Sequence, residues 1–233
     1  MTVTETRVAD GAVSLITMDD EKANALTKHD IAEMTGMIDA AAADADVVAV
    51  VIAGREGIFS GGFDLNVMNG GDMTAVLDLV ADGGDFVRHA YVAPIPVVAA
   101  CTGHAVAGAA LLLLGCDVRV GADGGFKLGF NEVAIGMSLP DWGNTIATER
   151  LSKRHLQRCV ANARFLDPSE AVDAGFLDEL VEPASVVDRA VELAAEFAAL
   201  DPAAYANTMK TFRADAATAM AEQANAMRAL SVT

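Results

Sequence analysis

The fold is decided by the stretch Ile58-Phe59-Ser60-Gly61-Gly62-Phe63-Asp64-Leu65, a glycine-rich turn that follows the apolar run Val47–Ala53. A second turn, Gly103-His104-Ala105-Val106-Ala107-Gly108, follows the apolar run Pro96–Ala100 in the same way. Apolar runs of this length, bounded by glycines, are typical of buried strands. Small residues let a ligand approach the backbone, and the unpaired N–H groups of such turns donate to anions. Two convergent N–H groups are what an oxyanion hole needs. The alternative is that both glycine clusters are simple tight turns.

Outward from these turns, strand, loop and helix alternate to about residue 175, which predicts an α/β layered fold. An Asp10-Gly11 turn predicts a hairpin, and Thr27 is a candidate helix cap. Beyond Pro183 the chain is largely helical, with a break at Asp201-Pro202. The expected strands are Val3–Val8, Ala12–Met18, Val47–Ala53, Val97–Ala100 and Asp117–Val120. The expected helices are Thr27–Ala43, Asp72–Ala90 (despite Gly83-Gly84), Val106–Gly115, a helix from about Trp142, Ala184–Leu200 and Ala203–Leu230.

Charge and composition exclude several classes of protein. The 233 residues are 53% hydrophobic and 21% charged, which is typical of a globular domain. Lys and Arg number 16 against 33 Asp and Glu, for a net charge of −17. Nucleic-acid binding needs a basic surface, so we expect no nucleic-acid partner. An anionic ligand must be met by local cations or by backbone dipoles.

The cysteines indicate the redox compartment of the protein, and one apolar segment is long enough to be tested as a membrane span. Cys101, Cys116 and Cys159 cannot all pair within one chain, which favours a reducing interior, and we expect a cytoplasmic protein. Val97–Cys116 carries no formal charge over 20 residues, a length that can span a bilayer. Glycines interrupt this segment and prolines precede it, so we expect a buried strand and a short buried helix instead.

Several well-known sites are absent from the sequence. There is no G-x-S-x-G, and Ala109-Ala110 stands where a phosphate-binding loop carries Lys-Ser/Thr. No G-x-G-x-x-G follows a strand, which argues against a dinucleotide cofactor. The histidines lack the spacing of zinc ligands, so we expect no metal site.

Taken in order, a set of motifs resembles the crotonase superfamily, also called the enoyl-CoA hydratase/isomerase family. The motifs run from about residue 5 to 230 and match more loosely in the last third. They are Glu21-Lys22-Ala23-Asn24-Ala25-Leu26, Phe59–Leu65, Pro96–Ala100, Gly103–Gly108, Cys116-Asp117, Gly129-Phe130-Asn131-Glu132 and Ala171–Glu182.

The resemblance implies a spiral of ββα units over residues 1–182 and a helical trimerisation region over residues 183–233. It implies an acyl-CoA thioester substrate, no separate cofactor, and a homotrimer or dimer of trimers. The N–H groups of Phe63 and Gly108 correspond to the oxyanion hole. The resemblance places these residues in the CoA site: Lys22, Ala23, Asn24, Ala25, Leu26, Gly61, Gly62, Asp64 and Leu65.

The departures from the family pattern bear on the reaction. Hydratases of this family use two glutamates; here Leu111 occupies the first position and Glu132 the second. Because water loses one of its two partners, we expect isomerisation, with Glu132 as the base. Asp141 is a second candidate acid, with a helix N-cap as its structural alternative. The structural alternative to a catalytic role for Glu132 is that it caps, or forms a salt bridge at, the start of the next element. Hydration, or acyl-CoA binding without catalysis, stays open as an alternative function.

Overall fold

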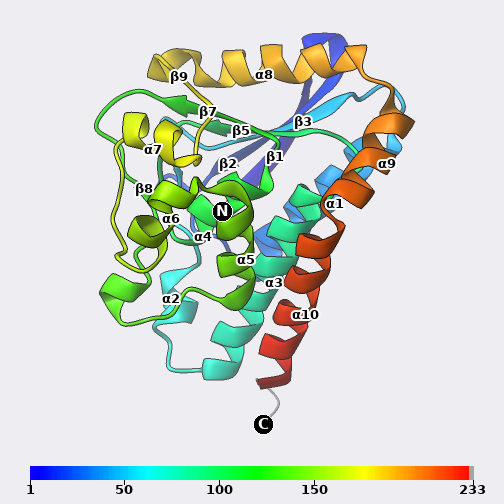
Figure 1. Cartoon of the computed structure of the whole chain (residues 1–233). Coiled ribbons are helices and arrows are strands. Elements are labelled where there is room, and N and C mark those ends of the chain that lie inside the picture. The colour runs from blue at the N-terminus through cyan, green and yellow to red at the C-terminus, as the bar shows by residue number, and fades with distance from the viewer. Residues whose placement is uncertain (231–233) are drawn as a thin grey trace.

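The computed structural model describes residues 1–230 and arranges their strands in two sheets (Figure 1). A six-stranded sheet has the order β1-β2-β3-β5-β7-β9, and a three-stranded sheet has the order β4-β6-β8. The β1–β2 pair is antiparallel and the other pairs are parallel. The strands are β1 Thr2–Val8, β2 Val13–Asp19, β3 Ala49–Ala53, β4 Gly57–Ser60, β5 Val97–Cys101, β6 Gly103–Val106, β7 Val118–Ala122, β8 Leu128–Gly129 and β9 Glu179–Val181.

The helices follow the strands in a repeating order. Three successive units, β3–β4, β5–β6 and β7–β8, each give one strand to the large sheet and one to the small sheet, and a helix follows each. This is the predicted series of ββα units. The helices are α1 Lys28–Ala43, α2 Leu65–Met68, α3 Met73–Tyr91, α4 Gly108–Gly115, α5 Asp141–Arg150, α6 Lys153–Val160, α7 Pro168–Ala174, α8 Val186–Glu196, α9 Pro202–Phe212 and α10 Ala214–Leu230.

Local signals account for the ends of several elements. A turn of 3-10 helix at Ala9–Gly11 joins β1 to β2 and sets Val8 opposite Val13, as the hairpin prediction required. Thr27 caps α1, because its hydroxyl accepts from the N–H of Asp30 while the Asp30 carboxylate accepts from the N–H of Thr27. Asp72 caps α3 by accepting from the N–H of Ala75.

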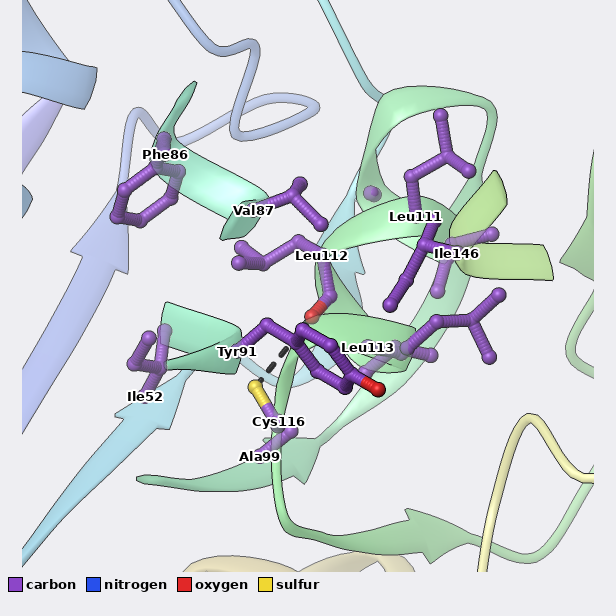
Figure 2. Packing of buried hydrophobic residues seen from close by; sticks show 14 of the residues in the cluster. Ile52, Phe86, Val87, Tyr91, Ala99, Leu111, Leu112, Leu113, Cys116 and Ile146 are labelled. Carbon is purple, nitrogen blue, oxygen red and sulfur yellow. Dashed lines mark hydrogen bonds between the residues drawn. The ribbon is translucent and has the colours of Figure 1, made fainter. Parts of the chain in front are cut away.

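The uncharged segment of residues 97–116 folds as β5, β6 and α4. Every residue of α4 is buried, and this helix packs between α3 and α5. Figure 2 shows its leucines among Phe86 and Val87 of α3 and Ile146 of α5. An apolar helix surrounded on all sides explains the run of leucines without a membrane. Within residues 1–230, no helix is both long enough and apolar enough to cross one.

All three cysteines lie in the interior and are unpaired. The Cys116 thiol donates to the carbonyl of Leu112 at 3.4 Å (Figure 2). Burial raises the pKa of Cys101 and of Cys116 to about 12 and also raises that of Cys159.

The C-terminal helices differ in one respect from the prediction. Helix α8 lies across the outer face of the large sheet, where Val186, Ala190 and Ala194 are buried (Figure 1). The expected continuous helix over residues 203–230 is wrong, because the chain breaks at Arg213 between α9 and α10. Arg213 is only 5% exposed: its guanidinium pairs with Asp117 at 2.9 Å and donates to the carbonyl of Tyr91.

Helix α10 then runs back along α3 and also packs against α5 of the same chain (Figure 1). Its last turn is held to α3 by Arg228, which pairs with Asp82 at 2.8 Å and with Asp85 at 2.6 Å. The proposed C-terminal region of residues 183–233 ends in three residues that lie outside the described part of the chain, and its division from the core at residue 182 stays a prediction.

Candidate active site

A cavity of about 520 Å³ lies where the two glycine-rich turns meet α3, α5 and α10. It is lined by Phe63 and Ala107 of the turns, by Leu111 of α4, and by the acids Glu132 and Asp141. The structure therefore brings the predicted acids and one predicted donor residue to a single cavity, and Gly108 follows directly after its lining residue Ala107.

The Phe63 amide is oriented by the strand-like pairing on either side of it. The N–H of Leu26 donates to the carbonyl of Gly62 at 2.8 Å, and the N–H of Asp64 donates to the carbonyl of Leu26 at 3.0 Å. Leu26 and Phe63 form a parallel bridge in which Leu26 bonds the residues before and after Phe63. In this geometry the N–H and C=O of Phe63 itself point away from Leu26. The Phe63 N–H has no acceptor within residues 1–230 and is directed away from Leu26.

The second predicted donor, Gly108, is the first residue of α4. Gly108 stands at the N-terminus of this helix, where backbone N–H groups have no intrahelical partner and the helix dipole favours negative charge. In the described part of the chain its N–H likewise meets no acceptor.

The two turns lie in direct contact at Gly62. A Cβ on this residue would lie 2.9 Å from the carbonyl oxygen of Val106 and 3.1 Å from the nitrogen of Gly108, and its φ is +90°. Only glycine satisfies both the close approach and the left-handed conformation. Gly62 thus sets the distance between the turns that carry the two donors.

Ala107, the residue before Gly108, has a strained backbone, with φ 55° and ψ −123°. This conformation belongs to the first central residue of a type II′ turn, where glycine is preferred. Its N–H donates to the carbonyl of Gly129 at 3.0 Å, which holds the turn against the small sheet. Strain of this kind is concentrated at functional sites.

Glu132 is a buried carboxylate on the wall of the cavity. It is 9% exposed, and its Oε2 accepts the N–H of Asn131 at 2.9 Å. Burial raises the pKa of Glu132, and the N–H groups of Glu132 and Asn131 only partly offset this. The side chain makes no cap bond to the following 3-10 turn, Val133–Ile135. Within residues 1–230, Glu132 thus forms neither the helix cap nor the salt bridge of the structural alternative.

Leu111 lines the same cavity and is 0% exposed. Its Cδ1 lies 3.3 Å from the position that a Cβ on Gly143 of α5 would take. The side chain therefore fills the space between α4 and α5, and it offers no polar atom to a water molecule in the cavity.

Asp141 lines the cavity from the first position of α5, and its side chain is exposed. The helix begins one residue earlier than expected, with Pro140 at the N-cap, and Asp141 makes no capping bond. The N-cap alternative for Asp141 is therefore wrong.

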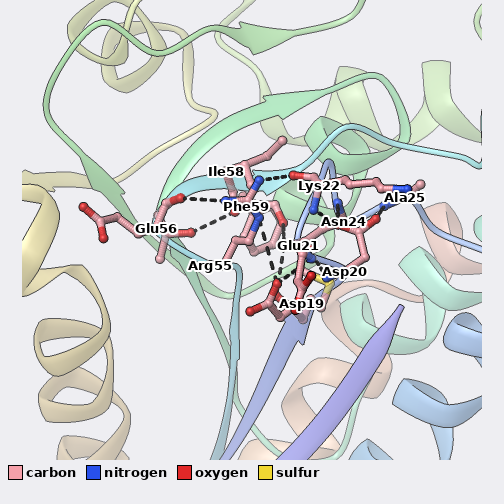
Figure 3. Close-up of polar contacts among 12 residues, drawn as sticks. Asp19, Asp20, Glu21, Lys22, Asn24, Ala25, Arg55, Glu56, Ile58 and Phe59 are labelled. Carbon is pink, nitrogen blue, oxygen red and sulfur yellow. Dashed lines mark hydrogen bonds and ion pairs between the residues drawn. The ribbon is translucent and has the colours of Figure 1, made fainter.

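The predicted CoA loop is held by its own acid and amide side chains. The Asp20 carboxylate accepts the N–H groups of Lys22, Asn24 and Ala25 (Figure 3). The buried Asn24 amide donates to the carbonyls of Met18 and Phe59 at 2.9 and 3.1 Å. Its side chain thus fixes the loop and is not available to a ligand.

The loop also contacts the donor turn directly. The N–H of Gly61 donates to the carbonyl of Ala23 at 2.7 Å. Of the residues expected at the CoA site, Gly61 and Leu65 line the cavity, whereas Lys22, Ala23, Asn24, Ala25, Leu26, Gly62 and Asp64 do not. Asp64 instead caps the short helix α2 by accepting the N–H of Asn66 at 2.9 Å.

Sequence reasoning missed two contributors. Arg55, between β3 and β4, donates to the carbonyl of Lys22, and its Nε lies 3.9 Å from Asp19, so a second cation stands beside the exposed Lys22 loop (Figure 3). On α10, Gln223, Met227 and Leu230 line the cavity. Their spacing of three to four residues was a signal for one helix face, but it did not show what that face covers.

No group of three or more His, Cys, Asp or Glu side chains in residues 1–230 is arranged to hold a metal ion.

Comparison with known proteins decides the family. The model of the enoyl-CoA hydratase/isomerase family matches residues 9–232. The chain belongs to this family. Its crotonase fold and its class, an enoyl-CoA hydratase/isomerase enzyme, follow from the same match, as the ordered motifs predicted. A probable enoyl-CoA hydratase, EchA17 of Mycobacterium avium (strain 104), is 30% identical over 193 residues, which cover 81% of this chain and 73% of the relative.

Solved structures agree with this fold. A probable enoyl-CoA hydratase EchA3 from Mycobacterium tuberculosis H37Rv has a TM-score of 0.91 at 39% identity, covering 98% of this chain and 95% of the other. An apo enoyl-CoA isomerase from M. tuberculosis has a TM-score of 0.90, also at 39% identity, with 97% of each chain covered. Human mitochondrial Δ3-Δ2-enoyl-CoA isomerase, 24% identical, shares the fold with a TM-score of 0.91 over 99% of this chain and 90% of its own.

Proposed function

We propose that this member of the family isomerises 3-enoyl-CoA thioesters to 2-enoyl-CoA thioesters. The observation that carries the proposal is the unequal pair Leu111 and Glu132, which line one cavity with a single buried carboxylate. An isomerase moves one proton between two carbons of its substrate, and one base suffices for that transfer.

The mechanism uses groups already in place. The thioester oxygen accepts the N–H groups of Phe63 and Gly108, and the Glu132 carboxylate takes a proton from the carbon next to the thioester. The resulting dienolate is stabilised by the two donors. Glu132 then returns the proton to the γ carbon, and the double bond comes into conjugation with the thioester. No atom is gained or lost, so no cofactor or water is needed.

The raised pKa of Glu132 supports its role as the base. A carboxylate held in apolar surroundings is a stronger base than one in water, which brings it nearer to the acidity of the substrate carbon.

Asp141 supports the runner-up function, hydration of 2-enoyl-CoA. It is an exposed carboxylate on the same cavity, so a water molecule between Asp141 and Glu132 would have two acidic partners. The exposed side chain leaves Asp141 free to reorient, unlike the buried Glu132. An acyl-CoA-binding protein without catalysis is the remaining alternative.

For CoA itself we propose the groove along the Lys22–Leu26 loop, with Gly61, Gly62, Asp64 and Leu65 at its inner end. Lys22 and, from the segment between β3 and β4, Arg55 place positive charge beside a loop that otherwise carries Asp19, Asp20 and Glu21. In a chain of net charge −17, these two cations are suited to the CoA phosphates.

We also propose a homotrimer or a dimer of trimers. Phe212, at the end of α9, is 76% exposed, and Leu200, just before that helix, is 46% exposed. Exposed large apolar groups on the C-terminal helices are suited to burial against another subunit. A monomer mass near 24 kDa in light scattering at micromolar concentration would reject this. We place the enzyme in the cytoplasm, where its three unpaired thiols are stable.

One assay separates the three functions. The purified protein is given 3-enoyl-CoA in one cuvette and 2-enoyl-CoA in another, and the absorbance of the conjugated thioester is followed. An isomerase raises the absorbance in the first, and a hydratase lowers it in the second. A binding protein changes neither, although calorimetry still detects acyl-CoA binding. A faster reaction with 2-enoyl-CoA than with 3-enoyl-CoA would overturn the isomerase proposal.

A further inference from the structure

Five of the eight large apolar side chains that are exposed within residues 1–230 border one cavity. Leu65, Met73, Ile135, Met137 and Leu230 are all exposed, and all of them line the cavity that contains Glu132. They come from α2, α3, the loop after Glu132 and the end of α10. An apolar patch that borders a pocket, rather than lying scattered over the surface, is typical of a site for an apolar ligand.

The charges of the cavity are all of one sign. Its lining within residues 1–230 holds the carboxylates of Glu132 and Asp141 and includes no Lys, Arg or His. The remaining polar lining is neutral, from residues such as Asn69, Asn131 and Gln223. An acyl chain with a terminal carboxylate would enter this cavity without a counter-charge and against two acids.

Helix α10 forms a fixed wall of the cavity. Gln223, Ala226, Met227 and Leu230 stand at positions i, i+3, i+4 and i+7, which lie on one face of a helix, and all four line the cavity. The ion pairs of Arg228 with Asp82 and Asp85 hold this end of α10 against α3, which contributes Val76, Leu77 and Val80 to the lining. This wall of the cavity is therefore already formed before a ligand binds.

The volume of the cavity exceeds the need of a short acyl group. A benzene molecule occupies a dry protein cavity of about 150 Å³, which corresponds to about 25 Å³ for each carbon. By that measure the cavity of 520 Å³ has room for about twenty carbon-sized atoms, only some of which belong to the thioester and the pantetheine end.

We infer that the site takes uncharged medium- or long-chain acyl groups, about eight carbons or longer, whose distal part lies between α3 and α10. This inference rests on the proposed acyl-CoA function. A short acyl group would leave the apolar rim in water, whereas a longer one covers it. Each methylene buried in this way contributes about 0.8 kcal/mol, or about a fourfold gain in affinity.

Calorimetry with saturated acyl-CoA probes tests the inference without relying on catalysis. We expect dodecanoyl-CoA and octanoyl-CoA to bind at least about tenfold tighter than butyryl-CoA. The CoA monothioester of dodecanedioic acid should lose most of that gain. Equal affinity for all chain lengths, or tight binding of the diacid thioester, would overturn the inference alone. If no acyl-CoA binds, the proposed function itself fails.

A matched pair of variants on α10 tests where the chain lies. Ala226 and Ala229 are both exposed, but only Ala226 lines the cavity. Ala226→Trp should reduce the preference for dodecanoyl-CoA over butyryl-CoA by about tenfold, the effect of roughly two displaced methylenes, and Ala229→Trp should keep the wild-type preference. An unchanged preference in Ala226→Trp, or an equal loss in both variants, would contradict a chain lying against this face of α10.

Discussion

The ring of Phe63 occupies the space where Gly83 has no side chain. A Cβ on Gly83 would lie 2.3 and 2.4 Å from Cζ and Cε1 of that ring, and one on Gly108 would lie 3.1 Å from it. The Phe63 ring therefore packs between helix α3 and the backbone of Gly108, the other predicted donor. The next glycine, Gly84, makes room in the same way for the Trp142 indole. Each of the two adjacent glycines of α3 thus leaves space for a different aromatic ring.

Gly83→Ala should displace the Phe63 ring and with it the Phe63 N–H. Because losing one oxyanion donor costs about 10²–10³ in kcat, a displaced donor should lower kcat by about 10- to 100-fold. Steady-state kinetics with 3-enoyl-CoA would measure this, with KM changing less than kcat.

Two further variants distinguish donor placement from general damage. Gly84→Ala introduces a similar clash, but against Trp142, so it should lower stability by about 1–3 kcal/mol with a smaller effect on kcat. Phe63→Leu, added to Gly83→Ala, should restore part of the lost kcat because the smaller side chain leaves room for the new methyl group. Equal losses of kcat in Gly83→Ala and Gly84→Ala, or no rescue, would contradict the positioning role.

Glu132→Gln should reduce kcat by about 10²–10⁴-fold, the usual contribution of a general base, with little change in acyl-CoA affinity. In the wild type, kcat/KM should fall as the pH drops through the raised pKa of Glu132. The acidic limb should therefore lie above the ordinary value of 4.5 for a glutamate. If Glu132→Gln keeps the wild-type rate while Asp141→Asn does not, the base is Asp141.

The same substitution should also change stability with a defined sign. Because folding raises the pKa of Glu132, the protonated side chain favours the folded state, and that contribution is lost as the pH rises through the folded pKa. Glu132→Gln should therefore be more stable than the wild type at neutral pH, and the two should converge below a pH of about 4. Urea unfolding at a series of pH values would measure the difference; a wild type that is the more stable at neutral pH would contradict it.

Ala107→Gly should stabilise the protein. The strained backbone at φ 55° and ψ −123° costs about 1–3 kcal/mol, which exceeds the roughly 0.4–1 kcal/mol by which glycine favours the unfolded chain. We expect the free energy of unfolding to rise by about 1 kcal/mol. Ala40→Gly, on the exposed face of α1, should lower it by a similar amount, since it places glycine in a regular helix.

Arg213→Met should destabilise the fold by about 3–5 kcal/mol, because it leaves the Asp117 carboxylate, which is only 11% exposed, without its counter-charge. Lys210→Met, on the exposed surface of α9, should change stability by less than about 0.5 kcal/mol. Urea unfolding of both variants would test this. In the double variant with Asp117→Asn, the loss should be smaller than the sum of the single losses, since the charges are removed together.

The sequence was most informative where the signal is local. The capping box at Thr27 and the apolar runs of β3 and β5 carry their structure within a few residues, so their positions could be predicted. The order of the glycine turns and the position of Glu132 then gave a candidate site. The assignment of donors and base to Phe63, Gly108 and Glu132 stays a prediction until the variants are measured.

The rest depended on contacts between distant segments. Nothing near Arg213 indicates that its side chain is buried against Asp117, about a hundred residues away, and so the break between α9 and α10 was missed. The apolar face of α10 could be seen in the sequence, but the cavity it covers could not. The same holds for Gly83 and Gly84. In the sequence they only weaken the prediction of a helix, and the rings that fill the space beside them cannot be seen there.

The buried thiols have a practical consequence for labelling. Cys101 and Cys116 are enclosed in the core with their pKa raised to about 12, and Cys159 is also buried with a raised pKa. The native protein therefore presents almost no thiolate to a maleimide dye at neutral pH. Ala229→Cys would then be the one reactive site on α10, without any need to replace the native cysteines. A fluorophore attached there would follow the end of this helix in real time while acyl-CoA enters and leaves.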